Sequence, residues 1–260
     1  MLLGDVVLSH ATAFLVRTHT PSGEDKIFLV TNWHNVSGKH RDGLRPVVAG
    51  SRDMPNKIKV WFPGANGKIS NFWTDVYDLY SRDACPNWLE YEDEAALVDV
   101  VAMQILVPEG VILFCVNDDL GDGTEYTVDM KTSIGSDVFV LGFPFLLETQ
   151  SLPIWKRASI ASEPSVALVS ENPKFLIDTA SRPGMSGSLV IQTSVNGIYV
   201  SEAGDIALSQ SAAKIVGIYS GRIGVEGSAD LQLGIVWPME IVTRIITNGR
   251  TAKHPHVKTL

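Results

Sequence analysis

The sequence predicts an all-β protein with one short helix near its C-terminal end. Strand-like runs at 13–17 and 26–31 flank one turn that contains Pro and Gly, and runs at 57–62 and 68–73 flank another, which indicates two hairpins. A helical spacing of apolar residues occurs only at 238–247. Many short strands separated by turns, with a single terminal helix, indicate an antiparallel barrel or sandwich.

The pattern of strands continues through the second half of the chain. The run at 98–106 is largely apolar and predicts a strand that is buried on both faces. Seven shorter runs that also read as strands follow it: 136–143, 165–169, 174–179, 188–193, 198–201, 214–220 and 232–236.

Composition and charge exclude several classes of function. The chain has 260 residues, of which 45% are hydrophobic, so it can bury a sizeable core. Its formal net charge of −8, with no Lys/Arg cluster, argues against nucleic-acid binding. No phosphate-binding glycine loop, dinucleotide motif or zinc spacing occurs, so no metal or organic cofactor is expected. Cys85 and Cys115 are expected to be unpaired thiols.

The chain lacks the patterns that would direct it to a membrane. No apolar stretch approaches the roughly 20 residues of a membrane-spanning helix, so no membrane partner is expected. The first residues lack a positively charged region followed by an apolar core, so no signal peptide is predicted. The compartment is otherwise unknown, and a cytoplasmic location is favoured.

A candidate nucleophile lies between two glycines. Ser186 belongs to Arg-Pro-Gly-Met-Ser-Gly-Ser at 182–188 and comes directly before an apolar strand. Glycine at position 184 permits the backbone conformation that turns an N–H group towards a developing oxyanion. The N–H groups of Gly184 and Ser186 are therefore the predicted oxyanion hole.

A serine hydroxyl needs a base, and the base needs a group that orients it. His34 is the candidate base because it closes an apolar strand at the start of a turn or short helix. Asp99 is the candidate orienting group, because a carboxylate inside an apolar strand would be costly to bury without a partner. His34, Asp99 and Ser186 form the predicted catalytic triad.

These residues lie in segments that resemble a known family. The order His, Asp, Ser is that of the trypsin-like, chymotrypsin-fold serine proteases, and the details resemble the protease domain of HtrA-type bacterial and organellar enzymes. The match spans roughly residues 11–247. The segments that carry it, in order, are 11–16, 31–36, 98–103, 135–145, 178–188, 216–220 and 233–240.

The resemblance implies a single peptidase domain over residues 1–260, without a following PDZ domain. It implies two six-stranded antiparallel barrels, about 8–115 and 130–237, a terminal helix at about 238–248, and a triad between the barrels. It also implies hydrolysis of peptide bonds in protein or peptide substrates through an acyl-enzyme.

Two residues next to the nucleophile depart from the family pattern. Digestive trypsin-like enzymes carry an aspartate at the position of Met185, and that aspartate pairs with a newly cut N-terminus. Methionine cannot form this ion pair, so activation by N-terminal cleavage is not expected. Ser188 replaces a glycine, which would distort the loop if the backbone φ there is positive.

The substrate pocket is predicted in outline. Ala180 aligns with the floor of the primary pocket, so a small apolar residue before the scissile bond is expected rather than Lys or Arg. Ser220, Gly221 and Arg222 are expected to pair with the substrate backbone. Arg222 either narrows the pocket, favours an acidic side chain, or points to solvent.

Two questions stay open at this stage. The segment 75–94 is acidic and aromatic, and it is either a solvated surface insertion or a loop that recruits substrate or a partner. The chain is expected to be an active serine endopeptidase. The alternatives are a latent enzyme whose oxyanion loop is ordered by a regulatory protein partner, and an inactive protease-fold module that binds proteins.

Overall fold

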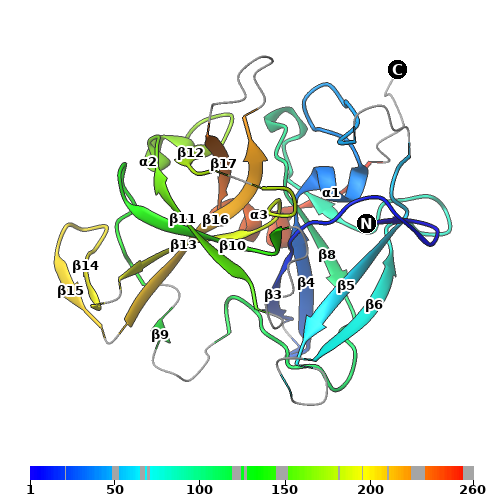
Figure 1. Ribbon diagram of the computed structural model, residues 1–260, viewed down its shortest axis with the longest axis horizontal. Helices are drawn as coiled ribbons and strands as arrows, with labels where there is room; N and C mark the ends of the chain where they lie inside the picture. The colour runs from blue at the N-terminus through cyan, green and yellow to red at the C-terminus, as the bar shows by residue number, and fades with distance from the viewer. Residues whose placement is uncertain are drawn as a thin grey trace.

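The all-β prediction is confirmed by strands that form two lobes side by side (Figure 1). The structure is a computed structural model. It describes residues 1–20, 22–48, 53–64, 68, 71–118, 124–125, 128–144, 152–180, 182–194, 196–209, 211–223 and 232–253. Residues 145 and 181 of the family-like segments lie outside this set.

The C-terminal lobe is a closed barrel. Its sheet has the order β13-β10-β11-β12-β17-β16-β9, and an additional β13–β16 pairing closes six of these strands into a ring. Apolar side chains from alternate strand positions, such as Val138, Ile177 and Val190, fill the interior. The strands are β9 (Thr124–Glu125), β10 (Asp137–Gly142), β11 (Ile154–Ile160), β12 (Phe175–Asp178), β13 (Leu189–Ser194), β16 (Ser211–Arg222) and β17 (Leu233–Pro238).

The N-terminal lobe packs two sheets around one core. One sheet has the order β18-β7-β8-β4-β3 and the other β2-β1-β5-β6. Leu15, Leu29 and Trp33 pack with Phe62 between the sheets. The strands are β1 (Leu2–Leu3), β2 (Val6–Val7), β3 (Phe14–His19), β4 (Asp25–Thr31), β5 (Lys57–Pro63), β6 (Phe72–Asp78), β7 (Leu89–Glu90), β8 (Val101–Ile105) and β18 (Arg250–Thr251).

The terminal helix α3 (Met239–Asn248) joins the lobes. Its buried Ile241, Val242 and Ile245 belong to a core cluster with residues of both lobes, including Val30 and Ile218. The predicted helix at 238–247 is therefore present, one residue later. A two-stranded antiparallel ribbon projects from the C-terminal lobe and consists of β14 (Ile198–Val200) and β15 (Ile206–Leu208) (Figure 1).

Three of the predicted strands differ in the structure. The run 98–106 was expected to be one strand, but β8 covers only Val101–Ile105, so Asp99 lies in the chain just before the strand. The run 165–169 was expected to be a strand, but Pro164–Ala167 forms the short helix α2. Proline at the first helical position explains this, because its fixed φ suits a helix start and its missing N–H costs nothing there. The strand expected at 68–73 is β6, which starts at Phe72; residues 69 and 70 are not among those described.

The acidic and aromatic segment 75–94 is exposed over 81–85 and partly buried in the core on either side of that stretch. Leu79 is fully buried and Trp88 is 1% exposed, and both pack in the core of the N-terminal lobe. The segment completes β6, forms β7 and ends in a 3-10 turn at Glu94–Ala96. In the part of the chain that the structure describes, no helix is long and apolar enough to cross a membrane.

Candidate active site

His34 lies in α1 (Trp33–Ser37), the short helix that follows β4. Asn32 precedes the helix with an extended backbone, and Gly38 ends it with a φ of 70°, a conformation that glycine adopts without strain. The helix is buried, and His34 itself is 7% exposed. A short rigid helix therefore holds the imidazole at the boundary of the two lobes.

Asp99 contacts His34 at two points. The carboxylate Oδ1 accepts a hydrogen bond from the His34 backbone N–H at 2.9 Å, and Oδ2 lies 2.7 Å from Nδ1 of the ring. Asn32 adds a third tie, because its side-chain amide donates to the Asp99 carbonyl at 2.9 Å. An imidazole that faces a carboxylate through Nδ1 carries its proton there, which leaves Nε2 as the acceptor.

Ser220 also belongs to this cluster. Its hydroxyl donates to Asp99 Oδ2 from the opposite lobe. The pairing of β16 with β17 shifts register between Tyr219 and Gly221, so Ser220 sits in a bulge that redirects its side chain. The sequence assigned Ser220 to the substrate pocket only, and its contact with Asp99 had no sequence signal.

Ser186 lies half-buried in the loop before β13, close to the same bulge. A Cβ built on Gly221 would lie 3.9 Å from the Ser186 hydroxyl oxygen. Gly187 ties the loop to β16, since its N–H donates to the Tyr219 carbonyl at 2.9 Å. The strand that supplies Ser220 to Asp99 therefore also holds the segment that carries Ser186.

The two predicted oxyanion donors have suitable surroundings. Gly184 has a φ of 94°, which only glycine adopts readily. The N–H groups of Gly184 and Ser186 have no hydrogen-bond partner among the residues described.

Thr12 holds the nucleophile loop from the other lobe. Its N–H donates to the Ser186 carbonyl at 2.8 Å, and its hydroxyl donates to the Gly184 carbonyl, also at 2.8 Å. The same hydroxyl accepts from the N–H of Phe143 at 3.1 Å. Thr31 donates in turn to the Thr12 carbonyl at 2.9 Å. Sequence reasoning missed Thr12, although it lies in the first of the family-like segments.

The residues that depart from the family pattern fit the loop. Met185 is 1% exposed and packs in the core of the C-terminal lobe. Ser188 is fully buried without a positive φ, so the expected backbone distortion is absent. Its hydroxyl has no partner among the described groups. A Cβ on Gly142 would lie 2.0 Å from that hydroxyl, so glycine at 142 is what makes room for Ser188.

Two of the predicted pocket residues are exposed. Ala180 is exposed just after β12, and Arg222 is exposed at the end of β16. Gly221 has a φ of 111° between the bulge and Arg222. The exposure of Arg222 fits a guanidinium that points to solvent.

A buried carboxylate supports the helix that carries His34. Glu90 is 2% exposed, and its Oε1 accepts a hydrogen bond from the Trp33 indole at 2.6 Å. Its Oε2 accepts from Arg41 at 3.1 Å and from Arg250 at 2.8 Å. Because Trp33 directly precedes His34, Glu90 ties α1 to β7 and to the chain that follows α3.

A second histidine lies near the first. The rings of His34 and His40 are 6.0 Å apart between centroids. Burial lowers the pKa of His40, and the positive charge that His34 can carry lowers it further. His40 is therefore neutral near pH 7 and adds no charge next to His34. In the described part of the chain, no cluster of three or more His, Cys, Asp or Glu side chains could hold a metal ion.

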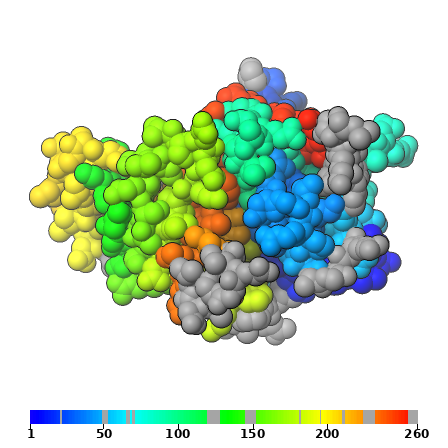
Figure 2. Space-filling view, turned by 90° about the horizontal axis from the view of Figure 1, so that it is seen from above, coloured from blue at the N-terminus to red at the C-terminus, as the bar shows by residue number. Residues whose placement is uncertain are grey.

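Residues of both lobes contribute to the site. Figure 2 shows segments of the N-terminal lobe, blue to teal, next to segments of the C-terminal lobe, green to yellow, on one face of the molecule. His34, Asp99 and Thr12 come from the first lobe, and Ser186 and Ser220 from the second.

Comparisons with known proteins give weak similarities only. No protein-family model and no curated protein sequence matches the chain. Among solved structures, the active form of the Rv3671c protease of M. tuberculosis is 13% identical, with a TM-score of 0.39, over 94% of this chain and 83% of that one. An inactive form of Rv3671c is 18% identical, with a TM-score of 0.36, over 91% and 81%.

One further structure is similar at the same level. The scabies mite inactivated protease paralogue S-I1 is 12% identical, with a TM-score of 0.42, over 90% of this chain and 91% of that one. At these values the fold rests on the strand arrangement described above, and the chemistry rests on the residues of the site.

Proposed function

We propose that this chain is a serine endopeptidase in which Ser186 is the nucleophile, His34 the general base and Asp99 the group that orients the imidazole. The observation that carries the proposal is the two-point contact between Asp99 and His34, made beside the loop that holds Ser186. A buried carboxylate that fixes one ring nitrogen leaves the other free to accept a proton.

The reaction follows from these positions. His34 Nε2 accepts the Ser186 proton as the hydroxyl oxygen attacks the scissile carbonyl carbon. The oxyanion that forms accepts hydrogen bonds from the N–H groups of Gly184 and Ser186. The protonated His34 then donates its proton to the leaving amine, which leaves an acyl-enzyme on Ser186. A water molecule, deprotonated by His34, releases the acid and restores the serine.

Thr12 and Ser220 act as positioning residues in this scheme. Thr12 holds the carbonyl groups of Gly184 and Ser186, which restrains the loop that carries the two N–H groups of the oxyanion hole. Ser220 donates a hydrogen bond to Asp99, which helps to hold that carboxylate in place next to His34.

The pocket residues support a small apolar side chain before the scissile bond. Ala180 offers a short apolar side chain and no carboxylate at the pocket floor, so a Lys or Arg side chain would find no counter-charge there. Ser220, Gly221 and Arg222 are the proposed partners of the substrate backbone. The HtrA-like relationship remains part of this proposal and rests on the family-like segments.

A latent enzyme is the second candidate. It is favoured by one observation: among the described residues, the Ser186 hydroxyl has no hydrogen bond to His34. In a latent enzyme, a protein partner would complete this contact and order the oxyanion loop. Catalytic hydrogen bonds are often long before substrate binds, so the same observation also fits an active enzyme.

Labelling with a fluorophosphonate probe tests both candidates. An active enzyme is labelled on Ser186, labelling is abolished in Ser186→Ala and strongly slowed in His34→Ala, and the control Ser170→Ala, at an exposed turn, is unchanged. A latent enzyme is labelled only when a partner or substrate peptide is added. A folded protein that is never labelled would contradict both candidates. If the protein is labelled, cleavage of a peptide library would define its substrate preference.

A further inference from the structure

The outer edge of β5 is unpaired over most of its length. β5 (Lys57–Pro63) pairs along its whole length with β6, but on its other edge only Lys57 has a partner, Leu2 of β1. Gly64 donates to Asn71 in the β6 direction, so by alternation the residues that direct their N–H and C=O groups to the outer edge are Lys59 and Trp61. In the described part of the chain no strand covers them.

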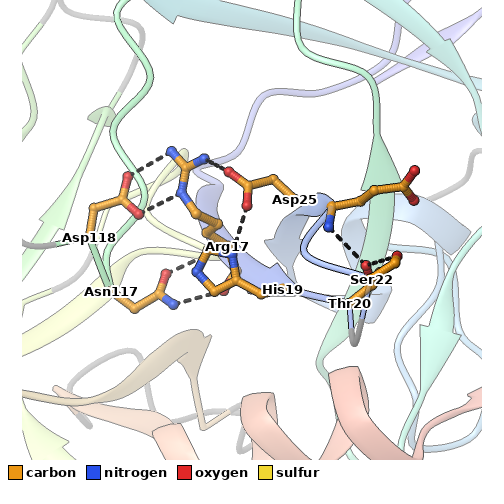
Figure 3. A network of polar contacts seen from close by, with 8 residues as sticks. Arg17, His19, Thr20, Ser22, Asp25, Asn117 and Asp118 are labelled. Atoms are coloured by element: carbon orange, nitrogen blue, oxygen red, sulfur yellow. Dashed lines mark hydrogen bonds and ion pairs between the residues drawn. The ribbon is translucent and has the colours of Figure 1, made fainter.

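The neighbouring edge, on β3, is already occupied. The Leu15 carbonyl accepts from the Val116 N–H at 2.9 Å. Farther along β3, the side-chain amide of Asn117 takes the place of a neighbouring strand. It accepts a hydrogen bond from the Arg17 N–H at 2.9 Å and donates one to the Arg17 carbonyl at 2.8 Å (Figure 3). Arg17 also binds Asp118 through two hydrogen bonds, which holds the segment in place. Among the residues described, the edge of β5 is therefore open where the edge of β3 is covered.

An apolar cavity of about 660 Å³ lies along this free edge. It extends from Val60 and Phe62 to Leu15, and it reaches Leu141 of the other lobe. The volume lies within the roughly 300–1,000 Å³ of typical ligand sites. Among the residues described, its wall contains no acidic side chain and includes Lys59. A ligand in this cavity therefore needs apolar side chains where it faces the apolar wall. Near the positive charge of Lys59 it needs neutral or acidic side chains.

The free edge and the cavity demand the same kind of ligand. Backbone N–H and C=O groups in a row are satisfied by another extended backbone, and alternate side chains of an added strand point to the same side. A bound strand would continue the register of β1, whose Leu2 faces Lys57, so that its next positions face Lys59, Trp61 and Pro63. Every second side chain would then enter the cavity.

We propose that this edge binds an extended peptide segment of another polypeptide, with alternating apolar and neutral or acidic residues, as an added strand antiparallel to β5. The binding itself does not depend on the proposed catalytic function. Thr12 lines the same cavity and holds the carbonyls of Ser186 and Gly184. The bound strand therefore contacts the residue that anchors the nucleophile loop, and this coupling is the part that rests on the proposed function.

The test uses the full chain and the peptide acetyl-Glu-Val-Thr-Val-Thr-Val-Glu-amide. Binding is measured by calorimetry, and amide hydrogen exchange locates it. We expect at least ten-fold slower exchange of the Lys59 and Trp61 amides when the peptide is bound. The matched control is the same peptide with N-methyl groups on the amides that face β5, which keeps every side chain but removes the strand pairing, and we expect it to bind at least ten-fold more weakly.

A protein variant provides an independent control. Val60→Asp places a charge in the wall of the cavity, whereas Val76→Asp places it at a site on β6 that is 45% exposed. We expect at least ten-fold weaker binding for the first, with the second unchanged, after circular dichroism has verified that both fold. If Val60→Asp does not fold, the N-methylated peptide still decides the question.

Three results would overturn the proposal. One is equal binding of the N-methylated and unmodified peptides, and another is protection of other amides with none at Lys59 and Trp61. The third is a concentration-dependent dimer of the free chain that protects the same amides, since a second copy would then be the occupant. A change in the rate of Ser186 labelling on peptide binding reports the coupling separately. Its absence, with binding intact, would leave the strand site standing and contradict only the coupling.

Discussion

Asp99 binds His34 through the backbone and the side chain of the same residue. Oδ1 accepts from the His34 N–H at 2.9 Å while Oδ2 lies 2.7 Å from Nδ1, so one carboxylate fixes both the helix start and the ring. Such a contact restrains rotation of the imidazole, because the ring cannot turn without breaking the bond to Oδ2.

Replacement of Asp99 by Asn should reduce kcat/KM by roughly 10³–10⁴. An amide can donate a hydrogen bond to Nδ1 and so favour the tautomer with its proton on Nε2, which cannot accept the serine proton. Peptide hydrolysis and the labelling rate of Ser186 are the measurements. Asp78→Asn, at an exposed position on β6, is the control. A loss below ten-fold in Asp99→Asn would contradict the assigned role.

Replacement of Thr12 by Val should lower kcat more than it changes KM. Valine keeps the shape but leaves the Gly184 carbonyl and the Phe143 N–H without the hydroxyl they now share. An unsatisfied buried group costs about 1–3 kcal/mol, so the free energy of unfolding should fall by that amount. Urea denaturation and steady-state kinetics measure both effects. Thr18→Val on β3 should change neither, and equal losses in both variants would argue against a role at the loop.

Replacement of Glu90 by Gln should lower the free energy of unfolding by about 3 kcal/mol, because the half-buried Arg41 loses its counter-charge and Arg250 keeps only the Glu94 carboxylate, 3.8 Å away. The amide can still accept from the Trp33 indole, so the effect isolates the charge. Glu94→Gln removes an ion pair at a side chain that is 55% exposed and should cost at most about 1 kcal/mol. Denaturant titration of both variants tests the difference.

The ion pair between Asp118 and Arg17 should contribute to the free energy of unfolding at neutral pH and lose that contribution at low pH. The hydrogen bond from Arg17 lowers the pKa of Asp118 below its ordinary value near 3.8. A carboxyl whose folded-state pKa is lowered stabilises the protein above its unfolded pKa and loses that contribution as the pH falls through the folded value. The free energy of unfolding should therefore decline below about pH 4, and less steeply in Asp118→Asn. Parallel slopes for both proteins would contradict this.

The two thiols should differ in reactivity. Burial raises the pKa of Cys115 to about 11, so it stays protonated at pH 8, whereas Cys85 is exposed. Titration with a thiol reagent should show one fast thiol in the folded protein and two after denaturation. Cys85→Ser should remove the fast phase, and a fast phase that persists in this variant would place the reactive thiol at Cys115.

Local sequence patterns predicted most strands because strand formation depends on alternation and turn residues that are close together in the chain. They failed at 165–169, where a proline that starts a helix outweighed the β-branched residues after it. The same patterns predicted that the whole segment 75–94 lies at the surface. Composition alone does not show that Trp88 and Glu90 are buried while other residues of the segment are exposed. That assignment depends on which other segments pack against it.

By itself the sequence determined the all-β class, the glycines around Ser186, His34 as the candidate base, and Asp99 as a carboxylate that needs a partner. Only the tertiary structure decided what those residues touch. Ser220 reaches Asp99 across 121 positions of the chain, and Thr12 reaches Gly184 across 172. Such contacts arise from the bulge in β16 and from the packing of two lobes, and so does the uncovered edge of β5. Nothing within a short window of sequence specifies them, because each depends on backbone that is distant in the chain and near in space.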